Sequence, residues 1–232
     1  MSVFARLVEQ LADLLQPFFH ASATAAAIIL FTALVRLATH PLARAAARGQ
    51  RARAALQPRI TELREKHARD PERLQRAVLE LHTKAKVSPV SGLLPGLLQL
   101  PAFFLLYHLF SNATIGEGPN TLLDHDLLAA PLGGHWTDAL GGGIFGGAGL
   151  VYLVLFAVVA VVATVNFRRT RRMAAENPVQ AGGTVPGQGV VGKVAPFLSF
   201  LTLVTVAVVP LAAALYVVTS TTWSAVERVV LS

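Results

Sequence analysis

The chain has 232 residues, of which 53% are hydrophobic and only 14% are charged. A soluble domain carries about a quarter charged residues, so this composition excludes an ordinary soluble protein and indicates an integral membrane protein with polar loops. The lack of cysteine excludes disulfides, thiolate metal sites and lipid-modified cysteines, and the net charge of +7 raises the question of where the cations lie.

The first 19 residues predict an amphipathic helix that Pro17 ends. Charged and polar side chains fill the gaps between apolar ones at helical spacing, which are Phe4, Leu7, Val8, Leu11, Leu14 and Leu15. Such a helix lies in the external membrane interface or packs on the rest of the protein, and both interpretations stay open.

Five apolar segments follow, and we expect each to cross the membrane once as a helix: residues 20–43, 92–110, 144–167, 194–209 and 211–230. The last two form one apolar stretch that is too long for a single span of roughly 20 residues. We expect the break at Pro210, because proline disfavours helix at the residue before it. The sequence therefore predicts an all-α membrane protein with five transmembrane helices.

The charges of the intervening segments predict the orientation. Residues 44–91 contain twelve Lys and Arg and residues 168–193 contain five, whereas residues 111–143 contain none. Because cytoplasmic loops carry the excess of cations, the first two segments are predicted to be cytoplasmic and the third external. The N-terminus is then outside and the C-terminus inside. This distribution accounts for the net charge without DNA binding, and the Gly- and Pro-rich segment 168–193 predicts a flexible loop.

The cytoplasmic segment 44–91 predicts a helical hairpin. Two apolar seams at helical spacing flank the turn. The first is formed by Leu56, Ile60 and Leu63, and the second by Leu74, Val78, Leu81 and Ala85. Asp70 is expected to cap the second helix, with Pro71 in its first turn. The basic outer faces are solvated or contact anionic lipid headgroups, and ribosomal RNA is a further candidate partner with weaker support.

The sequence contains no arrangement of residues that indicates catalysis. There is no Walker loop and no dinucleotide-binding fingerprint, the seven histidines are scattered, and the predicted spans hold no aspartate for an intramembrane protease. We therefore expect no enzyme activity, no cofactor and no metal ion.

Polar residues inside the predicted spans indicate a polar groove. Thr24, Thr32, Arg36 and His40 lie on one i, i+4 line of the first span together with Ile28. Intramembrane polar groups normally face a bundle interior or a watery cavity. The candidate groove residues are Arg36, Thr32, Gln99, Asn166, Ser199, Thr202, Thr219 and Ser220.

Arg36 has two interpretations. A cation at mid-depth costs roughly 2.5 to 3.5 kcal/mol, so Arg36 either extends to the nearby headgroups or faces a hydrated cavity, where it can attract an anionic ligand. Glu227, near the cytoplasmic end of the last span, is a candidate partner.

Residues 20 to 110 resemble the YidC/Oxa/Alb membrane protein insertases, and residues 194 to 230 do so more loosely. The matching motifs are R-x-x-x-x-P-L from Arg36, Q-P-x-I from Gln57, K-V-x-P from Lys86 and P-x-x-x-Q-x-P-x-F from Pro95. The match is to bacterial short forms without a large external domain, which implies a multi-pass protein of the bacterial cytoplasmic membrane.

The resemblance implies a hydrophilic groove that is open to the cytoplasm and to lipid and closed outside. By motif, Arg36 is the groove arginine that attracts acidic parts of nascent membrane proteins, and clients leave beside the second and fourth spans. No nucleotide hydrolysis is implied, and a ribosome and a Sec-type translocon are candidate partners. One departure is Glu227, where many relatives have glutamine.

Two other functions remain open from the residues alone. A small-anion transporter or channel could use Arg36 as its binding site, but transporters commonly show internal repeats and this chain shows none. A scaffold subunit of a membrane complex is the third candidate, and in it the groove would be incidental.

Overall fold

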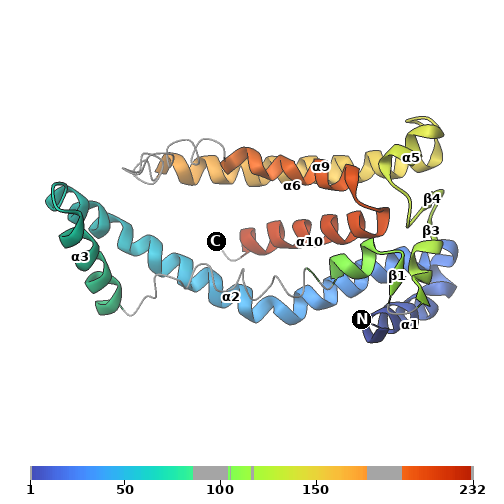
Figure 1. Cartoon of the computed structure of the whole chain (residues 1–232), viewed down its shortest axis with the longest axis horizontal. Coiled ribbons are helices and arrows are strands. Elements are labelled where there is room, and N and C mark those ends of the chain that lie inside the picture. Colours follow the sequence, from blue (N-terminus) through green and yellow to red (C-terminus); the bar gives the residue numbers. More distant parts are fainter. Residues whose placement is uncertain (1, 86–103, 105, 116–117, 177–194, 231–232) are drawn as a thin grey trace. The chain divides into compact units, whose positions relative to one another are not determined.

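A computed structural model of the chain describes residues 2–85, 104, 106–115, 118–176 and 195–230 (Figure 1). The described residues are mostly helical. They fall into two compact units, Met1–Leu37 with Phe103–Val229 and Ala38–Ala102 with Val230–Ser232, and each unit is considered by itself below.

The N-terminal helix α1 runs from Ser2 to Phe19 and is amphipathic, as the sequence predicts. It continues for two residues beyond Pro17, so the expectation that Pro17 ends it is wrong. The missing N–H of Pro17 falls in the last turn and leaves only the carbonyl one turn earlier without its helical donor. Val8 is fully buried, and the ring of Phe4 packs edge-on against that of Phe31, with 6.4 Å between the ring centroids. This helix therefore packs on the rest of the protein.

The next helix joins the first predicted span to the predicted hairpin without a break. After the 3-10 turn η1 (His20–Ser22), α2 runs from Ala23 to Lys66 through Pro41 and Pro58. The sequence predicts a boundary after residue 43, but the helix has none there. The division between the two compact units falls within α2, after Leu37.

The second unit contains the end of α2 and the helix α3, Pro71–Lys84. Asp70 caps α3 as predicted, because its side chain accepts a hydrogen bond of 3.0 Å from the backbone N–H of Arg73. Leu56 and Ile60 of the predicted seam are buried. His82, which the predicted seam does not include, is buried as well, and its Nδ1 lies 2.8 Å from the carbonyl oxygen of Val78.

The segment between the second and third predicted spans forms a small folded cap. It contains two short antiparallel pairs, β1 (Thr114–Ile115) with β2 (Gly118–Pro119) and β3 (Asp126–Leu127) with β4 (Ala130–Pro131), then α5 (Trp136–Gly141). Between the pairs lies the 3-10 turn η2, Thr121–Asp124.

Buried Asn120 ties this cap to the preceding helix. Its side-chain amide donates to the carbonyl oxygens of Leu109 (2.8 Å) and Asn112 (2.9 Å), and its Oδ1 accepts from the N–H of Leu122. The cap is therefore fixed to the bundle by hydrogen bonds as well as by packing.

The helix α6, Gly147–Glu176, is apolar on two faces. One face is buried through Tyr152, Leu155 and Val159. The other is an exposed apolar stripe at helical spacing, formed by Leu150, Val154, Val158, Val161 and Val165. A stripe of this kind on a soluble protein would lie open to water, so it is a surface suited to lipid. The helix also continues into the segment 168–193, which we predicted to be a flexible loop, as far as Glu176.

The last apolar stretch breaks at Pro210, where the sequence predicts. The 3-10 helix η3 (Ala195–Phe200) and α9 (Leu201–Val208) precede the break, and α10 (Leu211–Val230) follows it. Val209 takes the extended conformation that a following proline favours (φ −85°, ψ 157°).

Two helical stretches of the described chain are long and apolar enough to cross a membrane, one within Val3–Lys66 and the other Gly147–Arg172. Phe197–Val208 is a shorter apolar helix. The second predicted span, residues 92–110, lies mostly outside the described residues, so the count of five spans stays a prediction.

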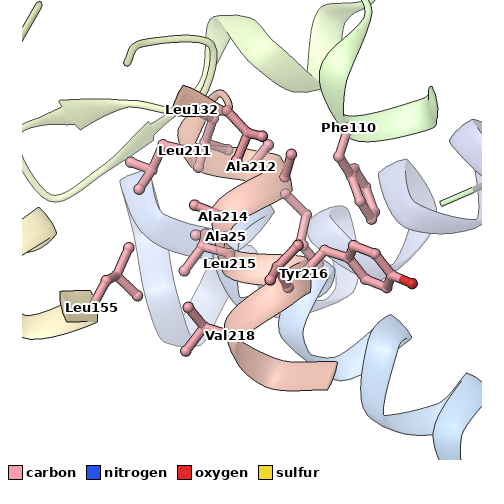
Figure 2. Close-up of a cluster of buried hydrophobic side chains, with 14 of the residues drawn as sticks. Ala25, Phe110, Leu132, Leu155, Leu211, Ala212, Ala214, Leu215, Tyr216 and Val218 are labelled. Atoms are coloured by element: carbon pink, nitrogen blue, oxygen red, sulfur yellow. The ribbon is translucent and has the colours of Figure 1, made fainter. Parts of the chain in front are cut away.

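The first unit is built around α10. Every residue from Leu211 to Val218 is buried. The side chains of this stretch that Figure 2 labels lie among Ala25 of α2, Phe110, Leu132 of the cap and Leu155 of α6. A helix that is apolar on all sides has to lie inside a bundle, and its alanines let neighbouring backbones approach closely.

The cap closes the N-terminal end of α10. The carbonyl oxygen of Gly134 accepts from the N–H of Leu211 (2.9 Å), and that of Leu132 accepts from the N–H of Ala212 (2.8 Å). The hydroxyl of Tyr152 on α6 also donates to the oxygen of Gly134 (2.7 Å). The first N–H groups of a helix have no partner inside the helix, so these loop carbonyls supply the missing acceptors.

Candidate functional site

Arg36 contacts α10 from inside the first unit. Its Nη2 donates a hydrogen bond to the hydroxyl oxygen of Ser220, whose residue is only 5% exposed. One turn before Arg36, the hydroxyl of Thr32 donates to the carbonyl oxygen of Ile28 (2.7 Å), and Thr32 is 1% exposed. The polar stripe of α2 therefore faces the protein interior, and its arginine lies against α10.

Glu227, the candidate partner of Arg36 in the sequence, follows Ser220 by seven residues, which is two helical turns along the same face of α10. The observed partner of Arg36 on α10 is Ser220. This contact favours an interior position for the guanidinium over extension to the headgroups.

A second polar region lies between α6, η3, α9 and α10. It is a cavity of about 330 Å³, which we call the polar cavity. Its described lining is formed by Val159, Val162, Ala163, Asn166, Thr170, Leu198, Ser199, Thr202, Thr221, Ser224 and Arg228. Arg36 is not among these residues. α10 therefore has polar groups on two faces, because Ser220 contacts Arg36 and Thr221, Ser224 and Arg228 line the cavity.

The hydroxyls that α10 contributes to the polar cavity are already used as donors. Thr221 donates to the carbonyl oxygen of Val217 (2.8 Å), and Ser224 donates to that of Ser220 (2.9 Å). Their oxygen lone pairs remain available to the cavity. A cavity of this size with several polar side chains has room and hydrogen-bonding partners for on the order of ten waters.

Two arginines hold the C-terminal end of α10. Nε of Arg228 donates to the carbonyl oxygen of Ser224 (2.9 Å), and Nη1 of Arg169 on α6 donates to that of Arg228 (2.8 Å). Cations near a helix C-terminus are favourable because the last carbonyls have no helical partner. This arrangement joins α6 to α10 beside the polar cavity.

The described lining offers no machinery for covalent chemistry. None of the described lining residues is a histidine, aspartate or glutamate, so Ser199 and Ser224 have no general base there. Among the residues that the structure describes, no group of three or more His, Asp or Glu could hold a metal ion. The described residues of this site can bind water and attract an anionic group.

The structure gathers the predicted site residues in two places. Asn166, Ser199 and Thr202 line the polar cavity, and Ser220 contacts Arg36. Thr32 is buried beside that contact. Thr219 is half-buried on α10 and is not among the described lining residues, and Gln99 lies outside the described residues.

Four polar residues of the polar cavity are missing from the sequence-based set: Thr170, Thr221, Ser224 and Arg228. A signal for them exists in the spacing. Thr170 follows Asn166 by four residues on α6, and the other three lie at i, i+3 and i+7 on α10, so each group shares one helix face.

Comparison with known proteins gives a family match over most of the chain. The model of the family described as "60Kd inner membrane protein" matches residues 14–232. The chain is 41% identical over 130 residues to the inner membrane ALBINO3-like protein 2 of the Chlamydomonas reinhardtii chloroplast, which is 56% of this chain and 28% of that protein.

Bacterial relatives give similar values. The chain is 36% identical over 129 residues to the membrane protein insertase YidC of Geobacter sulfurreducens, which is 54% of this chain and 24% of that protein. It is 38% identical over 102 residues to YidC of Clostridium perfringens, which is 44% of this chain and 43% of that protein. The chain therefore spans less than half the length of each of these relatives.

We predict that the polar cavity is hydrated in the membrane. Because the chain has no cysteine, Thr202→Cys and Val204→Cys each provide a single thiol on α9, the first in the cavity and the second on an exposed apolar face. A small charged thiol reagent should modify Thr202→Cys at least about tenfold faster in intact vesicles, since ionised thiolate needs water. Both variants should react alike in detergent-unfolded protein. Equal rates in vesicles, or a faster reaction at position 204, would contradict a hydrated cavity.

Proposed function

The chain belongs to the 60Kd inner membrane protein family, the YidC/Oxa/Alb family of multi-pass membrane proteins, and on this premise we propose that it inserts client membrane proteins into the bilayer and assists their folding. The observation that carries the proposal is the hydrogen bond between Arg36 and Ser220. It keeps a cation among buried side chains of α2 and α10, at the position where the sequence motif predicts the client-attracting arginine.

The proposed mechanism uses hydration and charge and needs no nucleotide or cofactor. A client's polar tail pays a large desolvation cost when it crosses lipid. A hydrated groove that reaches partway across the membrane shortens the apolar distance, and Arg36 attracts acidic residues of the tail where the local dielectric is low. The client's apolar helix then enters lipid, and burial of its apolar surface supplies the driving free energy. As an insertase the protein is not an enzyme.

We assign the groove to the predicted set: Arg36, Thr32, Gln99, Asn166, Ser199, Thr202, Thr219 and Ser220. The groove is open to the cytoplasm and to lipid, and clients leave beside the segments 92–110 and 194–209. Closure on the outside is supported by the cap, whose carbonyls bind the first N–H groups of α10 and whose Leu122 and Leu132 are buried.

The proposed architecture has five spans, an external N-terminus and a cytoplasmic C-terminus. The basic end of α2 and α3 then form a cytoplasmic hairpin whose cations contact anionic headgroups. The relatives are bacterial and chloroplastic, and we propose the bacterial cytoplasmic membrane as the location. Nascent membrane proteins are the proposed partners, with a ribosome and a Sec-type translocon as further candidates.

The orientation predicts opposite labelling of two positions. Single cysteines at Ser111, after the second segment, and at Gln50, in α2, should react with an impermeant thiol reagent from the outside and from the cytoplasm respectively. The positive-inside distribution is the physical reason. If both positions react in intact cells with reagent added outside, the orientation is wrong.

Charge at Arg36 should matter most for clients with acidic tails. In vesicles reconstituted with equal amounts of protein, Arg36→Gln should lower insertion of an acidic-tailed client roughly 5- to 30-fold, as expected from losing about 1 to 2 kcal/mol of attraction. A neutral-tailed version of the same client should be affected much less. Arg36→Lys should keep most activity, and Arg36→Glu should be worse for acidic tails because it repels them.

The same vesicles separate the candidate functions. A defect of Arg36→Gln that is equal for acidic and neutral tails would show that attraction of the tail is not the role of this arginine. If the wild-type protein inserts no client but carries small anions across the vesicle membrane, the protein is a transporter and the insertase proposal fails.

A further inference from the structure

The polar cavity contains a cation that the insertase mechanism does not use. Arg228 lines the cavity and lies on the last turns of α10, and Arg169 lies beside it through its bond to the Arg228 carbonyl. We propose that the polar cavity binds the phosphate group of an anionic membrane lipid, which occupies it while no client is bound. This inference rests on the topology of the proposed function, which puts this end of α6 and α10 at the cytoplasmic headgroups.

The donors around the cavity suit a phosphate. Nε of Arg228 is used by the Ser224 carbonyl, which fixes the guanidinium plane and leaves its Nη groups as donors. Arginine binds phosphate with charge-assisted hydrogen bonds of high geometric specificity. Asn166, Ser199 and Thr202 add neutral donors to the same cavity. Within the described part of the chain, no carboxylate forms a salt bridge with Arg228 or Arg169.

Along α6 the lining of the cavity changes from polar to apolar, as a lipid molecule does from its headgroup to its acyl chains. Thr170 and Asn166 line one end of the cavity, and Val159, Val162 and Ala163 line the other. These positions span twelve residues of α6, from Val159 to Thr170, and the eleven steps between them cover about 16.5 Å at 1.5 Å per residue. The polar end is the end with Arg228. A phosphate and its glycerol at the polar end, followed by an acyl chain at the apolar end, match this order.

The cavity borders an apolar surface on one side. Leu198 lines it and is 58% exposed, and Leu201, which follows it by three residues, is exposed as well. An acyl chain can therefore continue from the cavity along an apolar surface. Basic pockets between membrane helices on the cytoplasmic side are sites of this kind for anionic headgroups.

The volume suits the polar part of a lipid. The cavity has about 330 Å³, which is enough for a phosphate with its glycerol and a few waters.

The test is retention of lipid by the purified full chain. Native mass spectrometry of the wild-type protein in detergent with phosphatidylglycerol should show one strongly retained lipid per chain. Arg228→Gln should weaken this retention about tenfold or more, because the charged donor is lost. Arg228→Lys should retain an intermediate amount. Arg172→Gln, which removes a cation from the same end of α6 but not from the cavity lining, is the matched control and should retain lipid as the wild type does.

A second variant guards against loss of folding. Asn166→Leu fills the polar end of the cavity without changing the charge, and it should also reduce retention while thermal unfolding stays close to that of the wild type. Phosphatidylcholine should be retained less than phosphatidylglycerol. Inorganic phosphate at millimolar concentration should not displace the lipid, since it lacks the apolar part.

Three results would overturn the inference. One is equal retention by Arg228→Gln and Arg172→Gln. Another is complete displacement by inorganic phosphate, which would make the cavity a site for free anions. The third is equal retention of phosphatidylcholine and phosphatidylglycerol by the wild type, which would indicate unspecific lipid association. None of these measurements uses insertion, so a failure of the insertase proposal is detected separately by the Arg36 variants.

Discussion

The contact on which the rest of the first unit depends is the hydrogen bond from Arg36 to Ser220. A cation inside an apolar bundle needs a polar partner, and α10 can provide one only because it is the central helix. The two halves of α10 differ accordingly. Leu211 to Val218 are buried and almost wholly apolar, whereas the second half contains Ser220 and the polar cavity residues.

The same change of polarity occurs on the neighbouring helices. On α2, buried Ala25 and Ile28 precede Thr32 and Arg36, and on α6 buried Leu155 and Val159 precede Asn166. The apolar halves meet at the end that the cap closes, where Gly134 and Leu132 bind the first N–H groups of α10. Backbone groups in a bilayer have to be satisfied within the protein, and Pro210 prevents α9 from doing so by continuing into α10. The result is an apolar end that the cap closes and an opposite end with polar side chains and a cavity, which is the asymmetry that an insertase of the proposed kind needs.

Local signals in the sequence were sufficient for several of these features. Pro210 predicts the break before α10, and Asp70 predicts the cap of α3. The i, i+4 stripe leaves two interpretations of Arg36, and the contact with Ser220 favours the interior one. The continuity of α2 could not be predicted, because Pro41 favours a boundary, and whether a helix tolerates a proline depends on its tertiary surroundings. The prediction of a flexible loop over the whole segment 168–193 rests on its Gly and Pro residues. These residues all lie after Glu176, so they give no reason for α6 to end earlier.

The candidate site was predicted in part for a related reason. Single polar side chains in apolar spans stand out by composition, as Asn166, Ser199 and Thr202 do. Thr221, Ser224 and Arg228 share one face of α10, but that spacing does not tell what covers the face, and the packing of α6 and α9 against them shows the cavity. The prediction for Gln99 remains open, since that residue lies outside the described part of the chain.

The central claim is that nascent membrane proteins pass along the polar face of this bundle, and site-specific photo-crosslinking tests it most directly. A photoreactive amino acid at Gln99 or Thr202 should form adducts with a ribosome-bound membrane protein during its insertion. The same amino acid at Val154, on the exposed apolar stripe of α6, should form few adducts. Adducts at Val154 that equal or exceed those at Gln99 and Thr202, or none at all at the two polar positions, would contradict the account.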